Sequence, residues 1–254
     1  MLPYISIFNK EVPVYGVCMV LGILISSYIA YKRTIKLSGD ENSLIIIASC
    51  AIGLGLAGAK ILYVVVTYGI INTFEQIFSG NFSLLWESGL VFYGGLIAGI
   101  AGAYLGAWLT HEDMALFCDA IVPCIALGHA FGRLGCFFAG CCYGIPCEGV
   151  FCTSFPLVGI DHSTFPVQLL EMLINIAIFF CLSCFVRKVH RRYQVLYLYL
   201  MIYAISRFVL EFLRGDIVRG MSNGLSTSQW ISIGLFITSI CFSICQTAHR
   251  EERT

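Results

Sequence analysis

The sequence predicts an all-α protein, a polytopic helical bundle that crosses a membrane about seven times. Of its 254 residues only 12% are charged and 58% are hydrophobic, and the mean hydropathy is +0.85. A soluble domain has about a quarter of its residues charged. The apolar residues gather in stretches of about 20, which is the length a helix needs to cross a bilayer core of roughly 30 Å. The formal net charge of zero leaves no basic surface for binding nucleic acid.

Seven apolar stretches are expected to cross the membrane as helices. They are residues 12–31, 44–68, 90–109, 115–134, 166–186, 195–213 and 227–246. The first is longer than a signal-peptide core and lacks an A-x-A-like cleavage site, so we expect it to remain as a helix. No repeat, low-complexity tract or linker divides the chain. Residues 1–254 are therefore expected to form a single integral membrane domain.

Basic residues predict how the chain is oriented in the membrane. They follow the first, fifth and seventh stretches, as Lys32, Arg33, Lys36, Arg187, Lys188, Arg191, Arg192, Arg250 and Arg253. The loops 69–88 and 136–165, on the opposite side of a seven-span chain, contain no lysine or arginine. Because cytoplasmic loops hold the excess of positive charge, the N-terminus is predicted to lie outside and the C-terminus in the cytoplasm.

Several polar residues are expected at the depth of the outer leaflet, inside or at the ends of spans. They are Arg133, Gln168, Glu171, Arg207, Glu211 and Arg214. The last three are spaced i, i+4, i+7, which places them on one helix face. An ionisable group inside a span is costly unless it is paired or wet, so these residues point to a functional site. A structural ion-pair network with snorkelling arginines is the alternative.

Arg133 is the strongest candidate ligand-binding residue, because Gly132 and Gly135 on either side would leave its guanidinium accessible. A guanidinium offers a planar fork that suits phosphate, and the nearest abundant phosphate is a phospholipid headgroup. Glycines recur in three groups at the small-residue spacing that lets helices pack closely. These are Gly53, Gly55 and Gly58, Gly94, Gly95 and Gly99, and Gly128, Gly132 and Gly135. The sequence thus favours a phospholipid site within a tightly packed bundle.

Three segments, in order along the chain, carry motifs of one enzyme family. Residues 128–144 read GHAFGRLGCFFAGCCYG, similar to G-R-x-G-N-F-x-N-x-E-x-x-G. Residues 165–171 read FPVQLLE, similar to H-P-x-Q-L-Y-E, and residues 207–216 read RFVLEFLRGD, similar to R-F-x-x-E-x-x-R. Weaker matches lie at residues 15–16 and 93–96. By these motifs the chain resembles the prolipoprotein diacylglyceryl transferases of bacterial membranes, as a divergent and cysteine-rich member.

The resemblance implies a multi-pass transferase of the bacterial plasma (inner) membrane. Such an enzyme transfers the diacylglyceryl group of phosphatidylglycerol to the lipobox cysteine of a prolipoprotein, the first step of lipoprotein maturation. A thioether forms and glycerol phosphate is released. The implied partners are phosphatidylglycerol, prolipoprotein signal peptides and membrane lipids, without nucleic acid. The resemblance implies no cofactor and no metal.

The resemblance also implies roles for individual residues. The implied catalytic residues are Arg133 and Arg207, which would hold the phosphate, Glu211, which would orient them, and Tyr93. The implied substrate-binding residues are Tyr15, Gly94, Gly95, Arg133, Cys136, Gly144, Gln168, Glu171 and Arg214. Gly144 would be a position of close backbone approach, and Arg214 would lie at the rim of the site.

The chain departs from the family pattern at four positions. Tyr93 stands where the family commonly has histidine, Cys136 and Ala139 where it has asparagine, and Cys141 where it has glutamate. Tyrosine, with an ordinary pKa near 10, is a poor base at neutral pH, and His129 and His162 are alternatives. These departures keep two rival hypotheses open. One is a relative that uses another acceptor or is inactive, and the other is a lipid-binding or transport protein of the membrane.

Five of the thirteen cysteines fall within seventeen positions outside the spans or at their ends. They are Cys136, Cys141, Cys142, Cys147 and Cys152. Their spacings do not fit the C-x2-C pairs of zinc sites, so no metal site is predicted. Disulfides are possible in an oxidising exterior, although an odd number leaves one thiol over. Covalent catalysis by Cys141 or Cys142 is a less favoured alternative.

Overall fold

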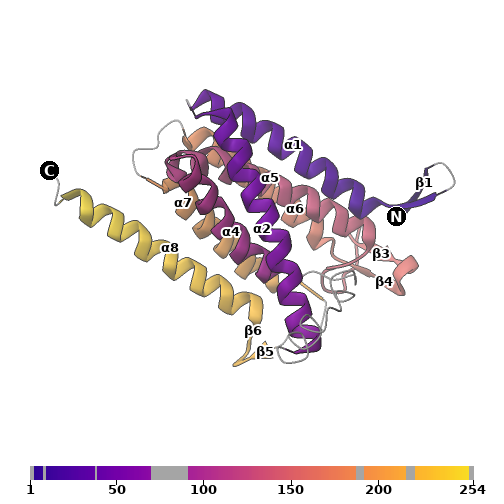
Figure 1. Cartoon of the computed structure of the whole chain (residues 1–254). Helices are drawn as coiled ribbons and strands as arrows, with labels where there is room; N and C mark the ends of the chain where they lie inside the picture. The colour runs from indigo at the N-terminus through magenta and orange to yellow at the C-terminus, as the bar shows by residue number, and fades with distance from the viewer. Residues whose placement is uncertain are drawn as a thin grey trace. The chain divides into compact units, whose positions relative to one another are not determined.

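The computed structural model describes residues 3–7, 10–37, 39–69, 91–186, 192–215 and 221–251. These residues form seven α-helices and three short β-hairpins (Figure 1). Six of the helices are long and apolar enough to cross a membrane. The predicted class, an all-α multi-pass membrane protein, is therefore confirmed. The chain divides into two compact units, one of Met1–Arg33 with Cys118–Thr254 and one of Thr34–Phe117, and each is described by itself.

Each predicted span corresponds to one helix. The helices are α1 (Val14–Lys36), α2 (Glu41–Tyr68), α4 (Phe92–Leu109), α5 (Met114–Ala139), α6 (Val167–Phe185), α7 (Gln194–Glu211) and α8 (Thr227–Glu251). The apolar part of α4, Gly94–Leu109, is shorter than the six long spans. Of the basic residues that predicted the orientation, Arg187, Lys188, Arg191 and Arg253 lie outside the described residues. The orientation stays a prediction.

The hairpins are short and lie between or before the helices. Strand β1 (Tyr4–Ile7) pairs with β2 (Lys10–Pro13), β3 (Thr153–Phe155) with β4 (Ile160–Thr164), and β5 (Met221–Ser222) with β6 (Leu225–Ser226), all antiparallel. A 3-10 turn, η2 (Pro156–Val158), connects β3 to β4. No strands were predicted in these segments. Strands of two to five residues are too short to show a clear alternation of apolar and polar residues.

In the unit Thr34–Phe117, helices α2 and α4 pack antiparallel through glycines. A Cβ atom added at Gly58 would meet the Cβ of Ala98 and would lie 2.7 Å from the carbonyl oxygen of Gly94. Further along, an added Cβ at Gly102 would meet the carbonyl oxygen of Cys50. The two backbones are therefore in direct contact, which is how small residues associate helices where lipid removes the hydrophobic driving force.

Helix α2 begins at a side-chain cap. The Asp40 carboxylate accepts hydrogen bonds from the backbone nitrogen of Ser43 at 2.7 Å and from its hydroxyl at 2.9 Å. These bonds stabilise the charged form and lower the pKa of Asp40. The cap supplies an acceptor for one of the amide groups that a helix start leaves unpaired.

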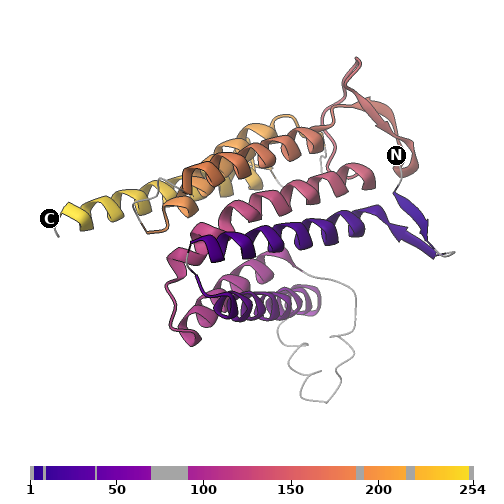
Figure 2. The same ribbon diagram turned by 90° about the horizontal axis from the view of Figure 1, so that it is seen from above.

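In the other unit, α1 and α5 run antiparallel along their length, as Figure 2 shows. A Cβ at Gly22 would lie 2.6 Å from the Cβ of Phe131, and one at Gly135 would lie 3.0 Å from the ring of Tyr15. At the opposite end, the Nε of Arg33 donates to the carbonyl oxygen of Ala120 at 3.0 Å. This register places Tyr15 beside the end of α5 that carries Arg133 and Cys136.

A pair of substitutions in α2 tests the glycine contacts. We expect Gly58→Ala to lower the stability by about 1–3 kcal/mol, because the added methyl group overlaps Ala98 and the Gly94 backbone. Gly53→Ala is the matched control in the same helix. An added Cβ there meets nothing within 4 Å, and replacing a helical glycine gains about 0.5–1 kcal/mol. Thermal unfolding in detergent measures both, and equal melting temperatures for the two variants would contradict the packing.

Candidate active site

The segment that follows α5 is held between the beginning of α6 and the end of α7 by backbone hydrogen bonds. The nitrogen of Gly144 donates to the oxygen of Phe165, and that of Ile145 to the oxygen of Leu213, both at 3.0 Å. Gly144 also forms an isolated bridge with Arg214. A Cβ at Gly144 would lie 2.5 Å from the Phe165 oxygen. The predicted close backbone approach at Gly144 is present, and the neighbouring backbone belongs to Phe165 and Leu213 of the same protein.

Arg133 on α5 pairs with Glu171 on α6. Its Nε lies 3.0 Å from Oε1 of Glu171, and the same Nε donates to Nε2 of His129 at 3.2 Å. The Nε–H is aligned on the histidine, so the contact with Glu171 is an ion pair without an aligned hydrogen bond. The Glu171 side chain is only 3% exposed, so water screens this pair little. Because Nε2 of His129 accepts the hydrogen bond from Arg133, this nitrogen is already occupied.

Arg207 on α7 pairs within its own helix. Its Nη2 lies 2.8 Å from Oε2 of Glu211 and donates to Oγ of Ser228, on α8, at 3.2 Å. The i, i+4 geometry is the one predicted from the sequence. Nη1 of Arg207 is buried and has no hydrogen-bond partner among the described residues. A buried guanidinium nitrogen without a partner is costly and is thus a candidate donor for a ligand.

Tyr203, on α7, interacts with charged residues of α5, α6 and α7. Its ring lies 5.5 Å from that of His129, centroid to centroid. It interacts electrostatically with Glu171, Arg207 and Arg133, and also with Arg214. The shared site of the two arginines stays a prediction. Tyr203 was not among the predicted site residues, although its position four residues before Arg207 puts it on the same helix face.

Gln168, at the start of α6, holds the segment after α5 by a side-chain hydrogen bond. It is fully buried, and its Nε2 donates to the carbonyl oxygen of Cys141 at 2.9 Å. One turn beyond Glu171, Asn175 donates to the Glu171 carbonyl oxygen at 2.8 Å. Gln168 thus positions the loop, whereas its predicted role toward substrate stays a prediction. Asn175 is a second buried polar residue, and it was not among the site residues predicted from the sequence.

Three thiols lie at the end of α5. The Sγ atoms of Cys136, Cys141 and Cys142 are within 4.8 Å of one another. Tyr15, 42% exposed, interacts electrostatically with all three and with Arg133. Hydrogen bonding from the other two thiols lowers the pKa of Cys142, and the charges of Arg214 and Arg133 lower it further. The cluster adjoins the arginines but was not predicted from the spacing of its members.

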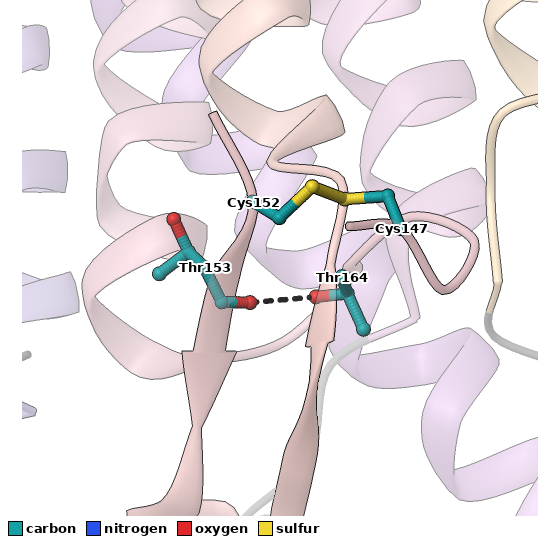
Figure 3. Close-up of a disulfide and its surroundings, with 4 residues drawn as sticks. All are labelled: Cys147, Cys152, Thr153 and Thr164. Carbon is teal, nitrogen blue, oxygen red and sulfur yellow. Dashed lines mark hydrogen bonds between the residues drawn. A yellow bond between two sulfur atoms is a disulfide. The ribbon is translucent and has the colours of Figure 1, made fainter. Parts of the chain in front are cut away.

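The remaining two cysteines of this segment form a disulfide. Cys147 is bonded to Cys152, and the loop they close precedes strand β3 (Figure 3). Next to it, Oγ1 of Thr164 donates to the carbonyl oxygen of Thr153 at 3.1 Å, which joins β4 to β3. Disulfides form and persist in oxidising environments, and the side of the membrane on which this loop lies stays a prediction.

Comparison with known proteins gives the family. A sequence model described as prolipoprotein diacylglyceryl transferase matches residues 3–245. The chain belongs to the prolipoprotein diacylglyceryl transferase family. It is similar to the phosphatidylglycerol–prolipoprotein diacylglyceryl transferase of Clostridium tetani, with 35% identity over 92% of this chain and 95% of the relative. It is also similar to transferase 2 of Clostridium perfringens, with 31% identity over 97% and 96% of the two chains.

Three predicted site residues of this family member lie in the other compact unit. Tyr93, Gly94 and Gly95 belong to α4, so their relation to the arginines stays a prediction. A Cβ at Gly94 would meet the carbonyl oxygen of Gly58, which gives this glycine a role in packing against α2. Of the alternative bases, His129 is engaged by Arg133, and His162 is exposed on β4.

A double-mutant cycle tests the pairing of Arg133 with Glu171. We expect Glu171→Gln to lower the unfolding free energy in detergent by about 3–5 kcal/mol, because it leaves a buried guanidinium unpaired. Adding Arg133→Gln should recover part of that loss. Glu148→Gln, at an exposed position, is the control and should leave the melting temperature unchanged. Strictly additive effects in the double variant would show that the two residues do not interact.

Proposed function

We propose that this protein transfers the diacylglyceryl group of phosphatidylglycerol to the lipobox cysteine of prolipoproteins. We further propose that residues 1–254 act as one transferase domain in the bacterial plasma (inner) membrane. Its partners would be phosphatidylglycerol, prolipoprotein signal peptides and membrane lipids. The observation that carries the proposal is the buried Nη1 of Arg207, which has no hydrogen-bond partner among the described residues, on a helix whose Tyr203 also interacts electrostatically with Arg133. The curated relatives carry the name of this activity.

The arrangement of charges suits a phosphate leaving group. The acceptor sulfur forms a bond to the glyceryl carbon, the carbon–oxygen bond to the phosphate breaks, and the electron pair leaves on glycerol phosphate. Negative charge then grows on the phosphate oxygen, where Arg133 and Arg207 would stabilise it. Glu211 and Glu171 hold the two guanidinium groups at 2.8 and 3.0 Å. The donors are therefore in place before the charge develops.

An apolar cavity of about 240 Å3 lies between α7 and α8. It is lined by Ala204, Phe208, Ser232 and Phe236, among others, and Arg207 is not one of its lining residues. Its lining is almost entirely apolar, which suits an acyl chain better than a free phosphate. The cavity is therefore a candidate site for an acyl chain of phosphatidylglycerol.

The other predicted residues would surround the acceptor. Tyr15, Cys136 and Gly144 lie at the end of the bundle where the segment after α5 meets Arg214. Tyr93 would have to approach from α4, together with Gly94 and Gly95. We propose Tyr93 as a contact to the acceptor, because an ordinary tyrosine is a poor base for a thiol.

Lysine substitutions test the arginines while keeping their charge. With phosphatidylglycerol and a peptide that contains L-x-x-C, the intact protein should add a diacylglyceryl mass to the peptide. Arg133→Lys and Arg207→Lys should each slow this addition by about 100-fold or more, because lysine cannot supply the planar donor pair. Arg192→Lys, at an exposed position outside the site, should keep the rate of the intact protein.

One result would overturn the proposed function, and another would overturn the role of the two arginines. The first is an unmodified peptide after incubation with folded, unsubstituted protein, which would favour an inactive relative or a lipid-binding protein. The second is an unchanged rate of transfer in both lysine variants. Mass spectrometry of the peptide shows whether it is modified. The initial rate of mass addition compares the lysine variants with the intact protein.

A further inference from the structure

The three thiols at the end of α5 have the geometry of a metal site. Cys136, Cys141 and Cys142 are free, and their Sγ atoms lie within 4.8 Å of one another. In a tetrahedral zinc site with Zn–S bonds of about 2.3 Å, the sulfurs are about 3.8 Å apart. The cluster therefore needs a shift of about 1 Å to surround an ion, which small side-chain rotations supply. Thiolate is a preferred ligand of soft ions such as zinc.

The backbone holds the thiols together before any ion is bound. Gly140 and Cys142 both have left-handed conformations, with φ of 71° and 60°. The nitrogen of Cys141 donates to the oxygen of Cys136 at 3.2 Å, which folds the chain back over the end of the helix. Gln168 fixes the same turn through the Cys141 carbonyl. A left-handed conformation is unfavourable for a residue other than glycine, and here it brings Cys142 to the other two thiols.

The cluster offers three ligands and leaves one side open. Among the described residues no further histidine, cysteine, aspartate or glutamate joins the group. Cys141 is exposed, whereas Cys136 and Cys142 are partly buried. Catalytic zinc sites have three protein ligands and an open fourth position, while structural sites are closed by four.

We propose that Cys136, Cys141 and Cys142 bind a zinc ion whose fourth position takes the thiol of the acceptor cysteine. This inference rests on the proposed transferase function. A thiol bound to zinc is held as the thiolate, which is the form that attacks carbon. The ion would thus supply what Tyr93 lacks as a base. It would also account for cysteines at positions 136 and 141, where the family pattern has asparagine and glutamate.

The charges around the cluster fit this assignment. Zinc with three thiolates carries one net negative charge, and the acceptor thiolate adds another. Arg133 and Arg214 both interact electrostatically with Cys142, and Arg133 also with Cys136. In the transfer, the acceptor thiol first gives its proton to water as it binds the ion. Its sulfur then forms the bond to the glyceryl carbon, and the carbon–oxygen bond breaks with its electron pair going to the phosphate.

Metal analysis of the full chain tests the site. Protein purified in detergent without chelator should contain about one zinc per chain by inductively coupled plasma mass spectrometry. Cys136→Ser, Cys141→Ser and Cys142→Ser should each reduce the zinc content at least tenfold. The matched control is the double variant Cys147→Ser/Cys152→Ser, which removes two neighbouring cysteines and should keep the zinc. Absence of zinc from the intact protein, or a disulfide among the three thiols, would overturn the proposal.

Cobalt replacement tests the open position. Removing zinc with a chelator and adding Co2+ should give the absorption bands of tetrahedral cobalt with thiolate ligands. The L-x-x-C peptide should increase the sulfur-to-cobalt band, and a peptide with serine in place of that cysteine should not. Equal spectra with the two peptides would overturn the open position. This measurement uses the unsubstituted chain, so it does not depend on whether a cysteine variant folds.

Activity separates this inference from the proposed function. Chelation should lower diacylglyceryl transfer by at least tenfold, and zinc should restore it. Full transfer by zinc-free protein would overturn the role of zinc while leaving the transferase function standing. Zinc and a cobalt response to the peptide without any transfer would instead overturn the function and leave the metal site standing.

Discussion

The structure depends on pairing charged side chains within apolar helices. Arg133 and Glu171 join α5 to α6, and Arg207 with Glu211 and Ser228 connects α7 to α8. A buried charge without a partner is strongly destabilising, so these contacts restrict how the four helices can pack. The same contacts fix the positions of the two guanidinium groups. Stability and site geometry therefore have one physical origin, and the cost of burying charge explains why so few charges lie in the spans.

Close backbone contacts set the rest of the site. Gly144 lies against Phe165 and Leu213, so the segment after α5 has little freedom to shift relative to α6 and α7. Glycine contacts between α2 and α4 do the same in the other unit. In lipid, where apolar side chains gain little by leaving their surroundings, such approaches are a main source of specific packing. The protein thus combines ion pairs with backbone contacts to hold polar groups in place.

The site divides into two parts with different chemistry. The arginines suit a phosphate group, and the apolar cavity between α7 and α8 suits an acyl chain. The thiols and Tyr15 lie at the end of α5, close enough to interact electrostatically with Arg133. Two of the four departures from the family pattern, Cys136 and Cys141, belong to this second part. A change in how the acceptor thiol is activated, with an unchanged way of binding the donor, accounts for that distribution.

The sequence by itself determined the membrane class, one helix for each predicted span and the placement of Arg207 and Glu211 on one helix face. Hydropathy over 20 residues and i, i+4 spacing depend only on residues that are close in the sequence, so they can be recognised before the tertiary structure is known. The pairing of Arg133 with Glu171, the position of Tyr203 and the meeting of the three thiols were decided only by tertiary structure. The thiols come together because Gly140 and Cys142 adopt left-handed conformations, which the spacing of cysteines does not encode. Contacts between distant segments depend on helix packing, and that packing is settled by the whole chain.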